Sequence, residues 1–207
     1  DQIWSLEAGH EPNQLWCGTI GGGLFRSDDA GDSWRLVESL WNEPFRKEWF
    51  GGGADMPGIH SVCVHPTQKG SLLVGVSCGG AWRSDDAGLT WRSSAKGMYA
   101  AFMPPERKYD EFIQDPHRIV QSPSDPRRLW TQHHNAIFRS DDGGATWNDV
   151  PDVAPSVFGF AVAVHPHEPD TAWFVPMKSD ETRHPVNGEL VVTRTRDAGK
   201  TFTTLCT

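Results

Sequence analysis

A chain of 207 residues with a formal net charge of −8, ten Trp, ten Phe, 21 Gly and 15 Pro combines many turn formers with many large aromatic side chains. This composition is typical of a compact, soluble protein built from short β-strands, and the length suffices for one domain with a substantial core. The acidic charge disfavours nucleic acid as a partner, because such binding depends on Lys and Arg. No apolar stretch reaches the roughly 20 residues of a membrane-spanning helix.

Neither the termini nor the cysteines identify the cellular compartment of the protein. No signal peptide is visible at the N-terminus, but the chain opens at Asp1 without Met, so we expect that a leader or an upstream region can precede it. Cys17, Cys63, Cys78 and Cys206 occupy non-equivalent positions and show no metal-ligand spacing. We interpret them mostly as buried thiols, with a disulfide as the alternative. We expect no cofactor, and no spacing demands a metal.

One short motif recurs along the chain. "RSDDAGDSW" (26–34) is followed by "RSDDAGLTW" (83–91), "RSDDGGATW" (139–147) and a looser "TRDAGKTF" (195–202), at intervals of 57, 56 and 55 residues. Self-similarity at a near-constant period indicates a repeat architecture in which each copy is one supersecondary unit. A catalytic group is needed only once, so a group present four times favours a structural role.

Each repeat contains four short runs separated by turn residues. In chain order they are an apolar run, a His-Pro or Ser-Pro turn, a second run such as "LLVGV", a polar or Gly-rich loop, a third run such as "AIFRS", the Asp turn and a last run beginning at the Trp. Four antiparallel strands per repeat form the blade of a β-propeller. We therefore predict an all-β protein with blades near 1–38, 59–95, 116–150 and 157–207, and helices limited to short turns in the long connections.

The pattern Ser-x-Asp-x-Gly-x-Thr-Trp resembles the Asp box, or bacterial neuraminidase repeat. This motif occurs in sialidases, sortilin-type receptors, a photosystem II assembly factor and many uncharacterised propellers of glycosyl-hydrolase type. The matching residues are Ser27, Asp29, Gly31, Ser33 and Trp34; Ser84, Asp86, Gly88, Thr90 and Trp91; Ser140, Asp142, Gly144, Thr146 and Trp147; and Thr195, Asp197, Gly199, Thr201 and Phe202. The resemblance implies a propeller that acts on or binds a glycan.

The residues of the motif have a physical explanation of their own. Ser, Thr and Asp side chains hydrogen-bond nearby backbone amides, and Gly supplies a positive φ, so together they close a tight turn between the third and fourth strands. The aromatic residue then packs over this turn. A calcium-binding EF-hand loop would need further oxygen ligands and a distal Glu, which are missing here. We therefore assign these residues to the scaffold.

Strand direction separates two rims. The Asp turn and the turn between the first two strands share one rim, so the long connections 39–58 and 96–116 lie at the other. Long loops in compact domains are commonly functional, and the alternative is that these two only cap the ring. The candidate ligand-binding residues at this rim are Asp55, His60, Glu106, Tyr109, Asp115, His117, Arg118, His133, His134 and Asn135. For any single His, a structural role is the competing interpretation.

Two classes of function remain open. A glycoside hydrolase or lyase would use acids such as Asp55, Glu106, Asp110 or Asp115, with Tyr99 or Tyr109 as nucleophile and Arg46 or Arg118 holding a carboxylate. The Phe-Arg-Ile-Pro motif of sialidases is missing, since "FRKE" (45–48) lacks Ile-Pro, so we do not expect sialidase activity. A non-catalytic module would instead bind a glycan, peptide or partner protein through loop aromatics such as Trp41, Trp49, Phe50 and Phe102.

Ring closure is the last open point of the sequence. Four blades are at the lower end of the propeller range, whereas propellers with this motif usually have six or more. Each blade supplies its own four strands, so no strand is left over to lock the two ends of the chain together. We therefore favour a larger ring, completed by further chain or by self-association, over a closed four-blade ring.

Overall fold

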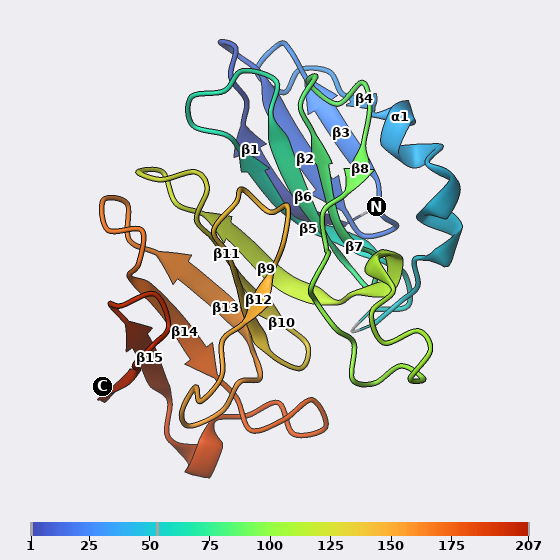
Figure 1. Cartoon of the computed structure of the whole chain (residues 1–207). Coiled ribbons are helices and arrows are strands. Elements are labelled where there is room, and N and C mark those ends of the chain that lie inside the picture. The colour runs from blue at the N-terminus through green and yellow to red at the C-terminus, as the bar shows by residue number, and fades with distance from the viewer. Residues whose placement is uncertain (1, 53, 207) are drawn as a thin grey trace. The chain divides into compact units, whose positions relative to one another are not determined.

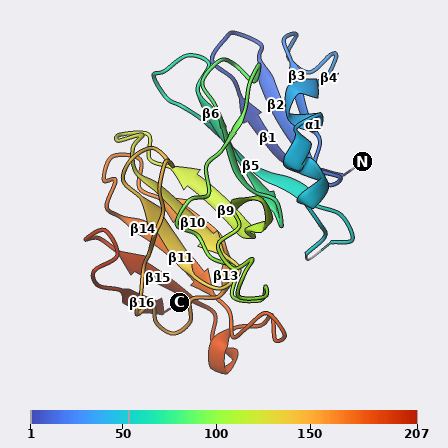
Figure 2. The same ribbon diagram turned by 45° about the vertical axis from the view of Figure 1, so that its right-hand side comes forward.

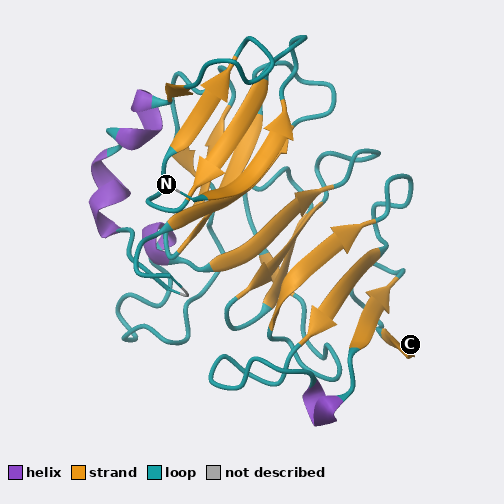
Figure 3. Ribbon diagram, turned by 180° about the vertical axis from the view of Figure 1, so that it is seen from behind, coloured by secondary structure: helices purple, strands orange, loops and turns teal. Residues whose placement is uncertain are grey.

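The computed structural model describes residues 2–52 and 54–206 of the chain. The predicted fold class is confirmed: consecutive strands form four antiparallel sheets of four strands each (Figure 1). Figure 3 shows that the few helices lie outside these sheets. Among the described residues, no helix is long and apolar enough to cross a membrane.

The four sheets use the strands in sequence order. The first sheet contains β1 (Ile3–Ala8), β2 (Leu15–Thr19), β3 (Leu24–Ser27) and β4 (Arg35–Leu36), and the second contains β5 (Gly58–Val64), β6 (Leu72–Ser77), β7 (Gly80–Ser84) and β8 (Arg92–Ser93). The third contains β9 (Pro116–Gln121), β10 (Leu129–His133), β11 (Ile137–Ser140) and β12 (Asn148–Asp149), and the fourth contains β13 (Gly159–Val164), β14 (Ala172–Pro176), β15 (Val191–Thr195) and β16 (Thr203–Cys206). The helices are α1 (Glu38–Trp41), η1 (Pro44–Glu48), η2 (Glu111–Ile113) and η3 (Val186–Gly188).

The chain forms two compact units. Unit 1 comprises Asp1–Ala95 and Asp110–Asp115, and it holds the first two sheets with α1, η1 and η2. Unit 2 comprises Lys96–Tyr109 and Pro116–Thr207, and it holds the third and fourth sheets with η3. Each unit therefore contains two blade-like sheets.

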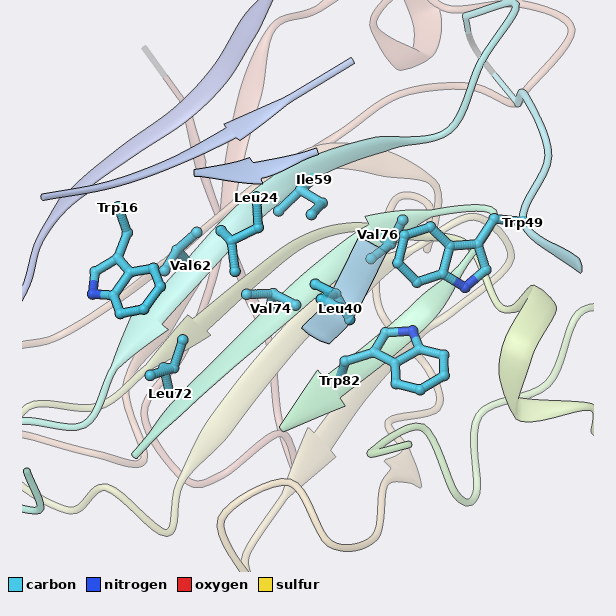
Figure 4. Packing of buried hydrophobic residues seen from close by; sticks show 10 residues of the cluster. All are labelled: Trp16, Leu24, Leu40, Trp49, Ile59, Val62, Leu72, Val74, Val76 and Trp82. Atoms are coloured by element: carbon cyan, nitrogen blue, oxygen red, sulfur yellow. The ribbon is translucent and has the colours of Figure 1, made fainter. Parts of the chain in front are cut away.

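The core of unit 1 lies between its two sheets. Figure 4 shows ten of its buried side chains, and Trp16 and Leu24 of the first sheet are each 1% exposed. Leu40 of α1 belongs to the same cluster, so the connection after the first sheet is anchored in the core. Burying a side chain of this size stabilises the fold by about 1.5 to 3 kcal/mol relative to exposure.

The core of unit 2 repeats this arrangement between its own two sheets, whose strands can be followed in Figure 2. Trp130 of β10 is fully buried and lies next to Phe174 of β14, with ring centroids 5.9 Å apart. A Cβ added to Gly199 would lie 3.4 Å from the Trp130 indole, and the same distance separates a Cβ at Gly88 from Trp16 in unit 1. In both units, therefore, a strand-two tryptophan packs on the Asp-turn glycine of the following sheet.

The Asp turns have the same hydrogen bonds in all four copies. In the third copy the Ser140 hydroxyl donates to Asp142 Oδ1 (2.8 Å) and accepts from the backbone N–H of Gly144 (2.8 Å). Asp142 also accepts from the backbone N–H of Thr146 (2.8 Å) and from its hydroxyl (2.7 Å). The side chains thus pair the backbone amides of a tight turn that has no ladder partners of its own.

These hydrogen bonds stabilise the ionised form of the aspartates. The pKa of Asp86 is lowered to about 2, first by the hydroxyl of Thr90 and then by the Thr90 backbone N–H. The pKa values of Asp29 and Asp197 are lowered to about 2 in the same way. A carboxylate that accepts several hydrogen bonds stays charged well below its ordinary range.

The aromatic residue that ends the motif is buried to different degrees. Trp147 is 3% exposed, whereas Trp34 is 37% exposed and donates from Nε1 to the carbonyl of Gly31 (3.1 Å). The expected packing of an indole over the turn is therefore much tighter in the third copy than in the first.

The turns between the first and second strands use a second repeated cap. His65 Nδ1 accepts from the backbone N–H groups of Thr67 (3.3 Å) and Gln68 (2.9 Å), and His165 Nδ1 accepts in the same way. In the third repeat the hydroxyl of Ser122 accepts from the Asp125 N–H (3.3 Å). Because Nδ1 is the acceptor, the cap requires the neutral imidazole.

The cysteines of the described part of the chain are free thiols. Cys17 and Cys78 are buried and Cys63 is partly buried, while the side chain of Cys206 lies outside the described atoms. Burial raises the pKa of both Cys17 and Cys78, and the Asp115 carboxylate raises that of Cys78 further. A raised pKa keeps both thiols protonated and poorly nucleophilic.

Ser140→Ala should lower the free energy of unfolding by about 1 to 3 kcal/mol, because the buried hydrogen bonds of the Ser140 hydroxyl with the Gly144 N–H and with Asp142 are lost. Urea unfolding followed by tryptophan fluorescence measures this loss. Thr67→Ala, at an exposed residue, is the control and should stay within about 0.5 kcal/mol of the parent. An unchanged stability in Ser140→Ala would contradict the role of the hydroxyl.

His65→Ser should make the stability less sensitive to acid. Burial first, and then the charges of Arg83 and His10, lower the pKa of His65 below its ordinary value of 6.5. The imidazole of His65 therefore binds a proton more readily in the unfolded chain than in the folded chain. The stabilisation that the neutral His65 cap gives to the fold is complete above pH 6.5 and declines as the pH falls below that value.

The measurement is the change in Tm between pH 7.5 and 5.5. We expect a smaller decrease for His65→Ser, which copies the Ser122 cap, than for the parent chain. His184→Ser, at an exposed histidine, should keep the decrease of the parent. Equal decreases in all three proteins would show that the cap does not respond to pH.

Candidate functional site

The first strand of every sheet has a β-bulge near its start. In β1 the register shifts between Ile3 and Ser5, and in β5 it shifts between Ile59 and Ser61. The pairing of β9 and of β13 shifts at the equivalent place of the repeat. Bulges re-aim the side chain that they carry and are over-represented next to active sites. The residues at this position of the four repeats are Trp4, His60, His117 and Phe160.

These four residues lie at the rim opposite the Asp turns of their own sheets. Strands alternate in direction within each antiparallel sheet, so the start of the first strand and the turn between the third and fourth strands lie at opposite ends. The loop between the second and third strands shares the rim with the bulge. Both features thus present side chains at the same edge.

In unit 2 the bulge residues of two neighbouring strands stack on each other. The His117 ring of β9 is nearly parallel to the Phe160 ring of β13, with a centroid distance of 4.6 Å and an interplanar angle of 19°. Nδ1 of His117 donates to the carbonyl of Gly159 (2.6 Å), which fixes the ring. Phe158 is buried and packs edge-on against His117 at 5.6 Å.

The loop between β14 and β15 adds charged groups to this pair. Asp180 Oδ2 lies 3.3 Å from Nε2 of His134, and Asp180 Oδ1 accepts from Arg183 Nη2 (2.8 Å). The Arg183 hydrogen bond is the main cause that lowers the pKa of Asp180, and His134 adds to it. The Arg183 guanidinium lies 5.5 Å from the Phe160 ring centroid. This cation–π contact connects the loop between β14 and β15 to the bulge of β13.

A third segment completes the group. Phe102, in the connection after the second sheet, contacts the His134 ring edge-on at 4.9 Å, and His134 contacts His117 at 5.4 Å. Phe102 is 43% exposed and Phe160 is 38% exposed. We call this group the rim cluster of unit 2: Phe102, His117, His134, Phe160, Asp180 and Arg183.

The rim cluster combines exposed aromatic surface with hydrogen-bonding groups. Phenyl and imidazole rings can stack on the apolar faces of a flat ligand, and the neighbouring ion pair can bind hydroxyl groups. Asp180 is the carboxylate of the cluster: its Oδ1 accepts from the Arg183 guanidinium and its Oδ2 lies 3.3 Å from Nε2 of His134. The arrangement suits binding and orientation of a neutral, polyhydroxylated ligand.

Two of the predicted site residues support the cluster from inside. His133 is fully buried with its ring edge-on to Phe138 at 5.2 Å. The Asn135 side chain donates to the carbonyl of Tyr99 (3.0 Å) and accepts from the N–H of Ala101 (3.0 Å). Asn135 therefore positions the segment that carries Phe102, whereas His133 is part of the core.

In unit 1 the predicted residues occupy two places. His60 is 5% exposed, contacts the half-exposed Trp4 edge-on at 5.9 Å, and has its Nδ1 at 2.8 Å from the Ser61 hydroxyl. Asp115 is 3% exposed and accepts from the Ser77 hydroxyl and the Cys78 N–H, both at 3.0 Å. This carboxylate holds the turn between β6 and β7.

The other predicted residues are exposed. Asp55 lies in the connection before β5, Glu106 and Tyr109 lie in the connection before η2, and Arg118 lies on β9 next to His117. The structure thus brings His117 and His134 together within unit 2, whereas a ligand-binding role for the predicted set stays a prediction. Sequence reasoning missed Phe160, and it placed the loop 178–184 at this rim without singling out Asp180 and Arg183. An alignment with His60 and His117 could have identified Phe160.

Tyr99 is placed as a structural residue. Its hydroxyl donates to Asp149 Oδ2 (2.9 Å), and its ring packs edge-on against Phe138 at 5.3 Å. Burial and then the Asp149 carboxylate raise the pKa of Tyr99 to about 12. A phenol with so high a pKa is a poor nucleophile at neutral pH.

Comparison with curated proteins gives distant relatives, and no family model matches the chain. It is 29% identical to a xyloglucanase of Acetivibrio thermocellus over 63% of this chain and 16% of the relative. It is 24% identical to a probable oligoxyloglucan-reducing end-specific xyloglucanase of Neosartorya fischeri over 93% of this chain and 25% of the relative. The chain thus spans a quarter or less of the length of these two relatives.

Solved structures show where the fold belongs. The GH74 xyloglucanase of Xanthomonas campestris superposes with a TM-score of 0.69 at 20% identity, over 97% of this chain and 29% of that structure. An ancestral GH74 enzyme superposes with a TM-score of 0.68 at 14% identity, over 98% of this chain and 25% of that structure. The fold of this chain is therefore similar to part of the fold of these two proteins.

Tyr109→Phe should leave a single tyrosine that ionises near pH 12, because the chain has only two tyrosines and the pKa of Tyr99 is raised to about 12. The absorbance of tyrosinate at 295 nm, recorded while circular dichroism shows a folded chain, gives the midpoint. Asp149→Asn removes the charge next to the hydroxyl and should lower this midpoint. A midpoint near 10 in Tyr109→Phe would contradict the placement of Tyr99.

Proposed function

We propose that this chain is part of a glycosyl-hydrolase-like propeller and that the rim cluster of unit 2 binds a β-glucan chain such as xyloglucan. The observation that carries the proposal is the pair of exposed phenyl rings, Phe102 and Phe160, in contact with the imidazoles of His134 and His117. Sugar rings present apolar faces to aromatic side chains and hydroxyl groups to charged ones. Xyloglucanases among the relatives support a polysaccharide as the ligand.

We assign binding to the rim cluster, and not cleavage of the glycosidic bond. Retaining and inverting glycosidases use two carboxyl groups, one on each side of the scissile bond, and Asp180 is the one carboxylate of the cluster. Its lowered pKa is also unsuited to a general acid, which needs a proton at neutral pH. Hydrolysis would therefore require a second carboxylate that acts together with Asp180.

Phe160→Ala should weaken the binding of a xyloglucan oligosaccharide about tenfold or more, because the sugar loses a stacking surface. Isothermal titration calorimetry on the whole chain measures the affinity. Phe45→Ala is the matched control, since Phe45 of unit 1 is similarly exposed, at 44%, and it should bind as the parent does.

Three results are informative. Loss of affinity in Phe160→Ala but not in Phe45→Ala supports the proposal. Equal affinity in all three proteins places the binding surface elsewhere, and absence of binding by the parent chain overturns the proposal. Release of reducing ends, followed in the same samples, separates a hydrolase from a binding module.

A further inference from the structure

Arg46 occupies an unusual place in unit 1. It lies in η1, in the connection between the first two sheets, and its guanidinium carbon is 3.6 Å from the Trp41 ring centroid and 5.8 Å from that of Trp49. Its Nη2 donates to the carbonyl of Gly21 (2.7 Å), in the loop between β2 and β3. The guanidinium is therefore stacked on aromatic rings at the rim opposite the Asp turns of the first sheet.

Two N–H donors of this connection have no acceptor among the described residues. Among the described residues, Arg46 Nε and Trp49 Nε1 are both buried and form no hydrogen bond. Trp49 is 6% exposed, so its indole nitrogen is also removed from bulk water. Buried donors are nearly always paired in folded proteins, and an unpaired one calls for an explanation.

The charge of Arg46 is also uncompensated. No Asp or Glu of residues 2–52 and 54–206 forms an ion pair with it, although part of the guanidinium is removed from water and burial lowers its pKa. Arg26 offers a contrast, since it also lies over an indole, that of Trp16 at 5.6 Å, but its Nη2 pairs with Asp28 at 2.7 Å. A partly buried cation without a carboxylate partner is a binding group for an anion.

We propose that Arg46 is the centre of a second ligand site, in unit 1, that binds the carboxylate of a uronic acid. A single guanidinium neutralises a single charge, and its planar fork matches the two oxygens of a carboxylate. Trp41 is 40% exposed and offers an indole to the apolar face of the sugar. Next to the guanidinium, no atom lies within 4 Å of the Cβ position of Gly21, which leaves space for a ligand.

The choice of a sugar rests on the proposed function, whereas the choice of a carboxylate rests on the unpaired guanidinium of Arg46. The test therefore uses three probes on the whole 15N-labelled chain: sodium glucuronate, sodium acetate and glucose. NMR follows the Nε–H of Arg46, assigned by its loss in Arg46→Lys, and the Nε1–H of Trp49, assigned by its loss in Trp49→Phe.

Glucuronate should shift both N–H signals in a saturable manner, and glucose at the same concentration should not. Acetate should bind at least tenfold more weakly than glucuronate, because it has no ring to contact Trp41. Arg46→Lys keeps the charge but loses the fork, so the Trp49 signal should then need at least tenfold more glucuronate. Trp41→Ala should reduce the affinity for glucuronate to that for acetate.

The control for Arg46→Lys is Arg26→Lys, which changes a stacked but paired arginine of the same unit and should leave glucuronate binding unchanged. Phe160→Ala should also leave it unchanged, so a failure of the proposed function in unit 2 is seen separately. The proposal is overturned if glucuronate gives no saturable shift in the parent chain, if glucose gives the same shift, or if folded Arg46→Lys binds as the parent does. If Arg46→Lys does not fold, the titrations of the parent chain with glucuronate, acetate and glucose still test the proposal.

Discussion

The hydrogen bonds between a buried hydroxyl, an aspartate and the backbone amides of one turn hold each sheet together. The fourth strand of the first three sheets has only two residues in the ladder, which is too short to pair stably without help. The Ser140 hydroxyl and its equivalents supply that help by fixing the turn that precedes it. Within each unit, the Asp-turn glycine of the second sheet also packs against a tryptophan of the preceding sheet. The same turn therefore contributes to the packing between the two sheets of the unit.

The rim opposite the Asp turns is therefore the part of each sheet where side chains are available to contact a ligand. Side chains at the Asp turns are committed to the backbone, whereas the bulges and long connections at the other rim present Trp4, His117 and Phe160 with partly exposed rings. A rigid scaffold with variable loops is the usual way in which a repeat fold carries a site. The rim cluster and the Arg46 site are both built in this manner, from a strand or loop of a blade and a connection between blades.

The fold could be predicted because its signals are local and repeated four times. Alternating apolar runs, His-Pro turns and the Asp motif each have a physical reason at a fixed offset. The site is harder, because the contact of Arg183 with Phe160 and that of Asp180 with His134 join segments with no shared periodicity. The adjacent histidines, His133 and His134, could not be distinguished from the sequence. Because β10 is buried on both faces, the sequence shows no alternation that would place His133 in the core and His134 at the rim.

The bulge position has a consequence for how such a protein can change. The scaffold accepts an indole at position 4, an imidazole at 60 and 117 and a phenyl ring at 160, so the backbone at this point does not dictate the residue type. Each repeat therefore contains one position at which the same backbone irregularity accepts different aromatic rings. Randomising these four codons in a display library would sample new ligand preferences while leaving the hydrogen bonds that close the blades untouched.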